Sequence, residues 1–154
     1  MPLIRLFLLL LAVCGSTVAV ARASLSASPA LDADGLLPVE EAFRLLPATR
    51  QAQNLRIEWT ISPGYYLYRG QLRFEVLTPQ GFRLAPPQLP TGLKVQDPEF
   101  GAVEVYRGIV AAQFQLPPGL KAPLKLRVRY QGCADIGICY PPQTQLLDVP
   151  AARS

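Results

Sequence analysis

Residues 124–130 read Leu-Lys-Leu-Arg-Val-Arg-Tyr, an unbroken alternation of apolar and basic side chains that ends in an aromatic residue. Successive side chains of a β-strand point to opposite faces, so this pattern predicts a strand with one buried and one solvated face. Four further segments are predicted as strands: 55–61, 72–76, 110–116 and 145–149. Half-buried strands of this kind are typical of antiparallel sheets that pack around a core.

Proline and glycine punctuate the chain, with sixteen prolines and eleven glycines among 154 residues. Because these residues end strands and form turns, the composition favours many short strands over long helices. The most economical architecture is an all-β, immunoglobulin-like β-sandwich formed by one domain over residues 36–150. Residues 38–46 begin with proline and place apolar residues at helical spacing, which predicts a short N-terminal helical segment ending before Pro47.

The first residues are typical of a secretory signal peptide. One early charge, Arg5, precedes the apolar run 6–13, and small residues that fit a cleavage site follow this run. The run is too short and too interrupted for a comfortable membrane span, so we expect residues 1–23 to be removed on export to the bacterial periplasm. A retained anchor is one alternative. A lipoprotein modified at Cys14 is another, although Val13 stands where a small residue is expected.

Short flanks are expected on both sides of the domain. Residues 24–35 are mostly small and polar, which indicates a flexible N-terminal arm, and residues 151–154 form a short C-terminal tail. After the signal peptide no stretch is long and apolar enough to cross a bilayer, so the sequence predicts a soluble mature chain.

Export changes the cysteine and charge counts. Of three cysteines, Cys14 leaves with the signal, and the remaining pair, Cys133 and Cys139, indicates a disulfide in an oxidising compartment. Removal of Arg5 and Arg22 from fifteen basic residues leaves thirteen against eleven acidic ones, a formal net charge of +2. This excess is too small to indicate binding to nucleic acid or to an anionic membrane surface.

The chain contains no histidine. This excludes a Ser-His or Cys-His nucleophile pair and any site that needs a histidine ligand. Thiol–disulfide exchange at Cys133 and Cys139 needs only an attacking thiolate, a leaving sulfur and controlled access. Two thiolates without further ligands do not complete a usual zinc site, so we expect neither a metal nor an organic cofactor.

The spacing of the two cysteines leaves two interpretations open. Gly132 is expected to permit a sharp exit from the preceding strand, and Gly137 lets the chain double back to bring the sulfurs within bonding distance. A loop this small constrains the unfolded chain by only about 2–3 kcal/mol in the entropy model, which favours a reactive bond. Small loops also hold structural disulfides, so an immunoglobulin-like binding or assembly module with an inert disulfide is the alternative.

Several segments together resemble the N-terminal periplasmic domain of the DsbD family of thiol–disulfide interchange proteins. Residues 130–142, Tyr-Gln-Gly-Cys-Ala-Asp-Ile-Gly-Ile-Cys-Tyr-Pro-Pro, closely resemble its active-site segment and are the most specific. Residues 64–69, Gly-Tyr-Tyr-Leu-Tyr-Arg, are similar to its tyrosine-rich strand. Residues 97–101, Asp-Pro-Glu-Phe-Gly, with 104–107 after them, resemble its cap loop, and residues 38–43 are similar to its opening helical segment.

The resemblance implies a redox domain that carries reducing equivalents between periplasmic thiol proteins through a Cys133–Cys139 dithiol–disulfide pair. By position, Cys139 matches the cysteine that forms the mixed disulfide with a partner, and Cys133 matches the one that resolves it. Phe100 matches the aromatic cap that covers the pair until a partner displaces it. The alternative is that Phe100 is an anchor that holds its loop to the core.

The resemblance also implies the partners. Members of the family continue into a membrane domain and a thioredoxin-like domain, whereas this sequence stops at Ser154. We therefore expect periplasmic thioredoxin-like proteins and a separate membrane-bound electron donor as partners of a monomeric chain, or else a changed function.

Four other side chains are candidates for the surroundings of the cysteines. The strand period places Tyr66 and Tyr68 on one face and Tyr65 on the other, so at least one of the three is expected in the core. The resemblance brings Tyr66 and Tyr68 to the site. Glu99 and Asp135 would disfavour thiolate formation if they lay close to the sulfurs, and they are ordinary solvated loop acids otherwise.

Overall fold

A computed structural model describes residues 35–152. The signal peptide expected over 1–23, all but the last residue of the arm expected over 24–35, and residues 153–154 lie outside this range. The helices and strands are α1 (Val39–Ala42), β1 (Phe43–Leu45), β2 (Thr49–Gln51), β3 (Asn54–Ile61), β4 (Tyr65–Tyr68), η1 (Arg69–Gln71), β5 (Arg73–Thr78), β6 (Leu93–Asp97), β7 (Gly101–Tyr106), β8 (Ile109–Gln115), β9 (Leu124–Tyr130), β10 (Gly132–Ala134) and β11 (Gln143–Val149).

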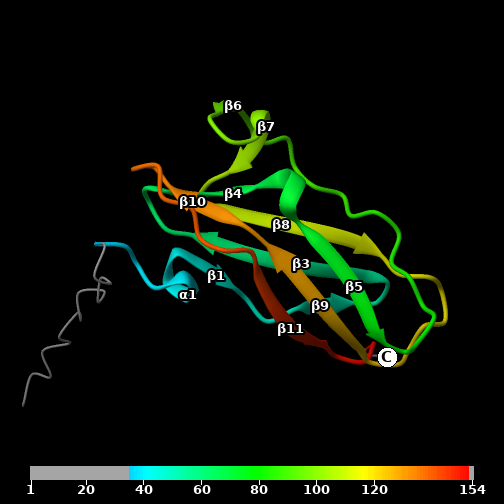
Figure 1. The fold of residues 1–154 in the computed structure, drawn as a ribbon. Helices are drawn as coiled ribbons and strands as arrows, with labels where there is room; N and C mark the ends of the chain where they lie inside the picture. Colours follow the sequence, from blue (N-terminus) through cyan, green and yellow to red (C-terminus); the bar gives the residue numbers. More distant parts are fainter. Residues whose placement is uncertain (1–34, 153–154) are drawn as a thin grey trace, which may run out of the picture.

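The strands form an immunoglobulin-like β-sandwich, as the alternating segments predict (Figure 1). One layer contains β1, β3, β2 and β8, and the other contains β11, β9 and β5 in that order, with antiparallel pairing throughout. Aromatic rings join the two layers. Trp59 of β3 meets Tyr130 of β9 at 5.9 Å between ring centroids, and Phe74 of β5 meets Phe114 of β8 at 4.9 Å.

The core follows the period of the sequence. On β9 the side chains of Leu124, Leu126, Val128 and Tyr130 are all buried, while the basic side chains between them are exposed or half-buried. The strand β3 repeats this pattern. Burial of one large apolar side chain contributes about 1.5–3 kcal/mol, so these two strands anchor the sandwich.

The predicted N-terminal helix exists but is shorter than the sequence indicated. The range 38–46 was expected to be helical, and the helix α1 occupies only Val39–Ala42. Phe43 leaves the helical conformation, with φ −134° and ψ 73°, and begins β1, which pairs with the end of β3. Its ring is fully buried between Tyr65, Tyr130 and Tyr140, and this packing overrides the local helical spacing.

A third sheet, in the order β10-β4-β7-β6, carries the cysteine segment at one edge and the β6–β7 hairpin at the other. This hairpin lies apart from the two main layers at the top of Figure 1. Its turn is the segment 98–100, so the predicted cap loop is the tip of the hairpin. Between residues 35 and 152 no helix is long and apolar enough to cross a membrane.

Candidate functional site

The two cysteines form a disulfide in which one residue is buried and the other is exposed. Cys133 lies in β10, opposite Tyr66 of β4, and is fully buried. Cys139 lies at the end of the following loop and is exposed to solvent. The loop reverses at Gly137, whose positive φ of 86° suits glycine and whose N–H donates to the carbonyl of Ala134 at 3.0 Å. Of the two cysteines, only Cys139 is therefore accessible from solvent.

Gly132 has a steric role that differs from the predicted sharp exit. The residue continues into β10, and its Cα packs directly against neighbouring groups. A Cβ at this position would lie 2.3 Å from the carbonyl oxygen of Tyr66 and 2.6 Å from the ring of Phe43. Glycine is therefore needed here because two elements meet without room for a side chain.

Tyr140, the residue after Cys139, fixes the far end of the loop. Its hydroxyl donates to the carbonyl of Leu37 at 2.5 Å, and its ring meets Phe43 edge-on at 5.3 Å between centroids. The N–H of Leu37 donates in turn to the hydroxyl of Tyr65 at 2.9 Å. The segment before α1 is thus part of the frame that holds Cys139.

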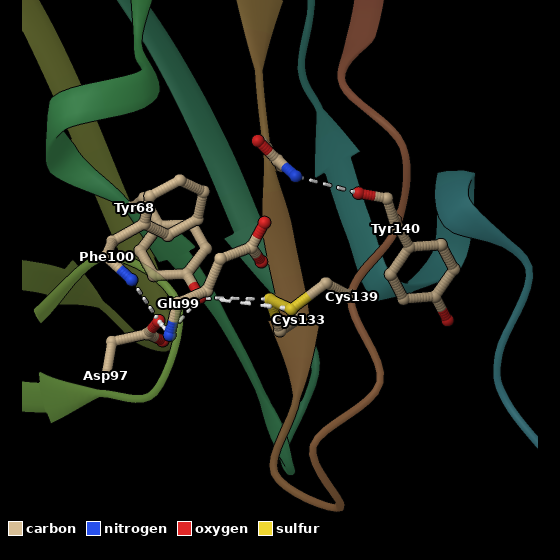
Figure 2. The surroundings of a disulfide bond; sticks show 8 residues. Tyr68, Asp97, Glu99, Phe100, Cys133, Cys139 and Tyr140 are labelled. Carbon is tan, nitrogen blue, oxygen red and sulfur yellow. Dashed lines mark hydrogen bonds between the residues drawn. A yellow bond between two sulfur atoms is a disulfide. The ribbon is translucent and has the colours of Figure 1, made fainter.

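Tyr68 links the disulfide to a carboxylate. Its hydroxyl donates to Oδ2 of Asp97 at 2.6 Å. The hydroxyl oxygen of Tyr68 also lies 3.2 Å from Sγ of Cys133 and 3.9 Å from Sγ of Cys139 (Figure 2). Burial, assisted by the hydrogen bond to Asp97, raises the pKa of Tyr68 far above its ordinary value. The hydrogen bond from Tyr68, followed by that from the N–H of Phe100, lowers the pKa of Asp97. At neutral pH the pair is therefore a neutral phenol and a carboxylate.

This arrangement turns a hydrogen-bond acceptor toward Cys133. A phenol has one proton, and at 2.6 Å that proton is committed to Asp97. The oxygen of Tyr68 thus presents lone pairs to the sulfur. After reduction, a neutral Cys133 thiol can donate to this oxygen, whereas a thiolate would face lone pairs with a negative charge behind them.

The cap loop rests on the same tyrosine. Phe100 is 39% exposed, and its ring meets Tyr68 edge-on at 5.1 Å between centroids. Oδ1 of Asp97 accepts the N–H groups of Glu99 and Phe100, each at 2.9 Å. In Figure 2 the Glu99 side chain extends from this loop toward the side on which the disulfide lies. Asp97 therefore orders both the phenol and the loop that carries Phe100.

Asp135 is paired with a cation. Its two oxygens accept from Arg107 at 2.7 and 3.0 Å, and Arg107 also lies over the ring of Tyr66 at 5.1 Å from its centroid. The sequence left two interpretations of Asp135 open, a negative neighbour of the sulfurs or an ordinary solvated loop acid. In the structure Asp97, through Tyr68, is the carboxylate connected to the sulfurs.

The sequence predicted that Tyr66 and Tyr68 lie at one site with the two cysteines, and the structure places them together. Cys133 pairs with Tyr66 in the sheet, and the ring centroids of Tyr66 and Tyr68 lie 5.4 Å apart. Sequence reasoning missed the roles of three residues: Asp97, Arg107 and Tyr140. Only Asp97 carries a local signal, because an Asp that opens a turn commonly accepts the N–H groups two and three residues later.

Comparison with known proteins identifies the family. Residues 33–151 match the family model described as "Thiol:disulfide interchange protein DsbD, N-terminal". The chain is 38% identical to "Thiol:disulfide interchange protein DsbD 1" of Pseudomonas aeruginosa over 148 residues, which cover 96% of this chain and 25% of that protein. It is 36% identical to "Thiol:disulfide interchange protein DsbD" of Escherichia coli K12 over 141 residues, which cover 92% of this chain and 23% of that protein. The chain thus spans about a quarter of the length of these relatives.

Solved structures agree with this match. The reduced form of the Neisseria meningitidis DsbD N-terminal domain superposes with a TM-score of 0.70 at 29% identity, over 79% of this chain and 95% of that one. The same domain in a complex with the PilB N-terminal domain gives a TM-score of 0.64 at 30% identity, over 77% and 90%. With its sandwich, its disulfide loop and these similarities, the chain belongs to the DsbD N-terminal domain family.

Proposed function

We propose that this chain is a periplasmic thiol–disulfide interchange domain whose Cys133–Cys139 pair passes two electrons to oxidised thioredoxin-like proteins. The observation that carries the proposal is the asymmetry of the pair, with a fully buried Cys133 and an exposed Cys139 beside a cap loop. Membership of an interchange family supports it. The complex that a relative forms with the PilB N-terminal domain supports a protein partner for the site.

The exchange proceeds in two substitutions at sulfur. The Cys139 thiolate attacks one sulfur of the partner disulfide, which forms a mixed disulfide and releases the other partner sulfur as a thiolate. Cys133 then loses its proton, attacks Sγ of Cys139, and releases the second partner cysteine. The partner gains two electrons, and this domain is left with the Cys133–Cys139 disulfide. Tyr68 accepts the hydrogen bond of the resting Cys133 thiol, so this thiol stays neutral until the mixed disulfide forms.

The surroundings of the reaction are part of the proposal. Residues 36–150 form the redox domain, and residues 1–23 direct it to the periplasm. A membrane-bound electron carrier supplies the electrons that restore the dithiol. The relatives are about four times longer than this chain, so their further segments are candidates for that supply.

A redox titration tests the exchange function. Graded dithiol is expected to reduce the Cys133–Cys139 bond while the far-ultraviolet circular dichroism of the sheet persists. The reason is that the loop closes over only six positions and contributes about 2–3 kcal/mol, whereas the strands supply the core. A sample alkylated after complete unfolding calibrates the thiol count. If the disulfide is reduced only when the circular dichroism of the sheet is lost, the bond is structural, and the chain is a binding or assembly module.

The cap is tested by Phe100→Ala. The Phe100–Tyr68 ring pair is worth about 0.5–1.5 kcal/mol, so its loss raises the open population about two- to tenfold. Stopped-flow alkylation of the reduced protein at neutral pH should accelerate by this factor. The matched control is Leu146→Ala, which removes an exposed apolar side chain from β11, in a different sheet. Equal rates for wild type and Phe100→Ala, with both folded, would mean that Phe100 only packs its loop.

A further inference from the structure

Arg107 follows β7 directly and makes a two-pronged ion pair with the cysteine loop. Its Nη2 lies 2.7 Å from Oδ1 of Asp135, and its Nη1 lies 3.0 Å from Oδ2. Asp135 stands two positions after Cys133, inside the loop that the disulfide closes. Parallel N–H···O bonds of this kind fix the orientation of both partners, which a single contact between point charges does not.

The guanidinium is itself held on β4. Its Nη1 donates to the carbonyl of Tyr65 at 3.3 Å, and its central carbon lies 5.1 Å from the ring centroid of Tyr66. Tyr66 is the residue that pairs with Cys133 in the sheet. Arg107 thus contacts both β4, the strand that pairs with Cys133, and the loop that leads to Cys139.

Backbone hydrogen bonds also order this loop, including those from the N–H of Gly137 to the carbonyl of Ala134 and from the N–H of Tyr140 to the carbonyl of Gly132, each at 3.0 Å. The N–H of Asp135 donates to the carbonyl of Gly64 at 2.8 Å, and the N–H of Ala134 donates to that of Ile138 at 2.8 Å. The side chains of Ile136 and Ile138 are exposed, so apolar packing contributes little to its order. The disulfide is the strongest constraint on the loop, and reduction removes it.

We infer that Arg107 is a positioning residue for exchange, which tethers the cysteine loop to β4 so that the two thiols stay close after reduction. This inference rests on the proposed function. The tether and the disulfide order the same loop, so each is more favourable when the other is present. Loss of the tether lets the reduced loop spread, and the equilibrium then favours the dithiol more than it does in the wild type.

Equilibration with glutathione measures this coupling. The two thiols and one oxidised glutathione give the protein disulfide and two reduced glutathione molecules, and alkylation followed by mass spectrometry reports the oxidised fraction. Arg107→Met is expected to lower the equilibrium constant about two- to fivefold, because an exposed ion pair contributes up to about 1 kcal/mol. Asp135→Asn should lower it similarly, and the double variant should be no lower than either single one, since both remove one interaction.

Arg127→Met is the matched control. Arg127 forms a comparably exposed ion pair with Glu75 at 2.7 Å in the β5–β9 sheet, so its replacement should leave the glutathione equilibrium unchanged. Thermal unfolding of each variant checks that the fold persists. An unchanged constant in Arg107→Met, additive losses in the double variant, or an opposite shift in Asp135→Asn would each overturn the tether. A folded wild type that does not exchange at any glutathione ratio would overturn the proposed function and the tether together.

Discussion

Cys133→Ala is expected to capture a thioredoxin-like partner in a stable mixed disulfide, whereas Cys139→Ala is expected to capture very little. Cys139 is exposed and remains free to attack in the first variant, while no second thiol is left to resolve the product. In the second variant the remaining thiol is fully buried. It reacts only after local opening, which costs on the order of 3 kcal/mol and slows attack about a hundredfold.

The measurement uses a thioredoxin-like protein with one active-site cysteine, blocked as a mixed disulfide with a coloured aromatic thiol. Attack by the reduced domain releases the colour, and non-reducing electrophoresis shows the joined proteins. Circular dichroism of both variants controls for folding. Equal colour release by Cys133→Ala and Cys139→Ala would contradict the roles assigned to the two sulfurs, though it would leave the interchange function standing.

Gly132→Ala is expected to lower the free energy of unfolding by about 1–3 kcal/mol or more, the cost of forcing atoms into a packed interior. The added carbon would lie 2.3 Å from the carbonyl oxygen of Tyr66, a backbone atom that cannot move without disturbing the β4–β10 pairing. The ring of Phe43, at 2.6 Å, is fully buried and packs against the rings of Tyr65, Tyr130 and Tyr140.

Chemical denaturation of Gly132→Ala and of a matched variant, Gly70→Ala, measures this cost. Gly70 has nothing within 4 Å of an added Cβ and is exposed, so alanine there should change the free energy of unfolding by less than about 0.5 kcal/mol. Because Gly132 precedes Cys133, the destabilised variant should also expose the buried thiol to alkylation. Equal stability of the two variants would show that the sheet relaxes around the new side chain.

The sequence predicts the sandwich because its main strands are buried on one face. In β9 and β3 a slip by one residue would turn the apolar set to solvent, so the alternation is strict and visible. The hairpin strands β6 and β7 lack this constraint. Leu93 is 57% exposed and Lys94 and Gln96 are also exposed, so no clear period marks β6. Only the resemblance of the cap loop pointed to this region.

The sequence predicted the parts of the site that are close together in the chain, and it missed the contacts between residues that are far apart in the chain. The cysteines lie six positions apart and carry a specific motif. Asp97 meets Tyr68 across 29 positions, Arg107 meets Asp135 across 28, and Tyr140 meets Leu37 across 103. Pairings of this range are created by strand order, which one sequence does not reveal. Asp135 therefore looked like a free charge until the fold supplied its partner.

The hydrogen bond from the Tyr140 hydroxyl to the carbonyl of Leu37 bears on the order in which the site forms during folding. A ribosome delivers Leu37 long before Tyr140, since 103 positions separate them. The frame around Cys139 therefore closes only after nearly every strand has been synthesised, and contacts of such long range form slowly. The two sulfurs, six positions apart, can meet almost as soon as they emerge. Because short loops close faster than long ones, the disulfide loop is expected to close before its frame when the chain folds in an oxidising compartment.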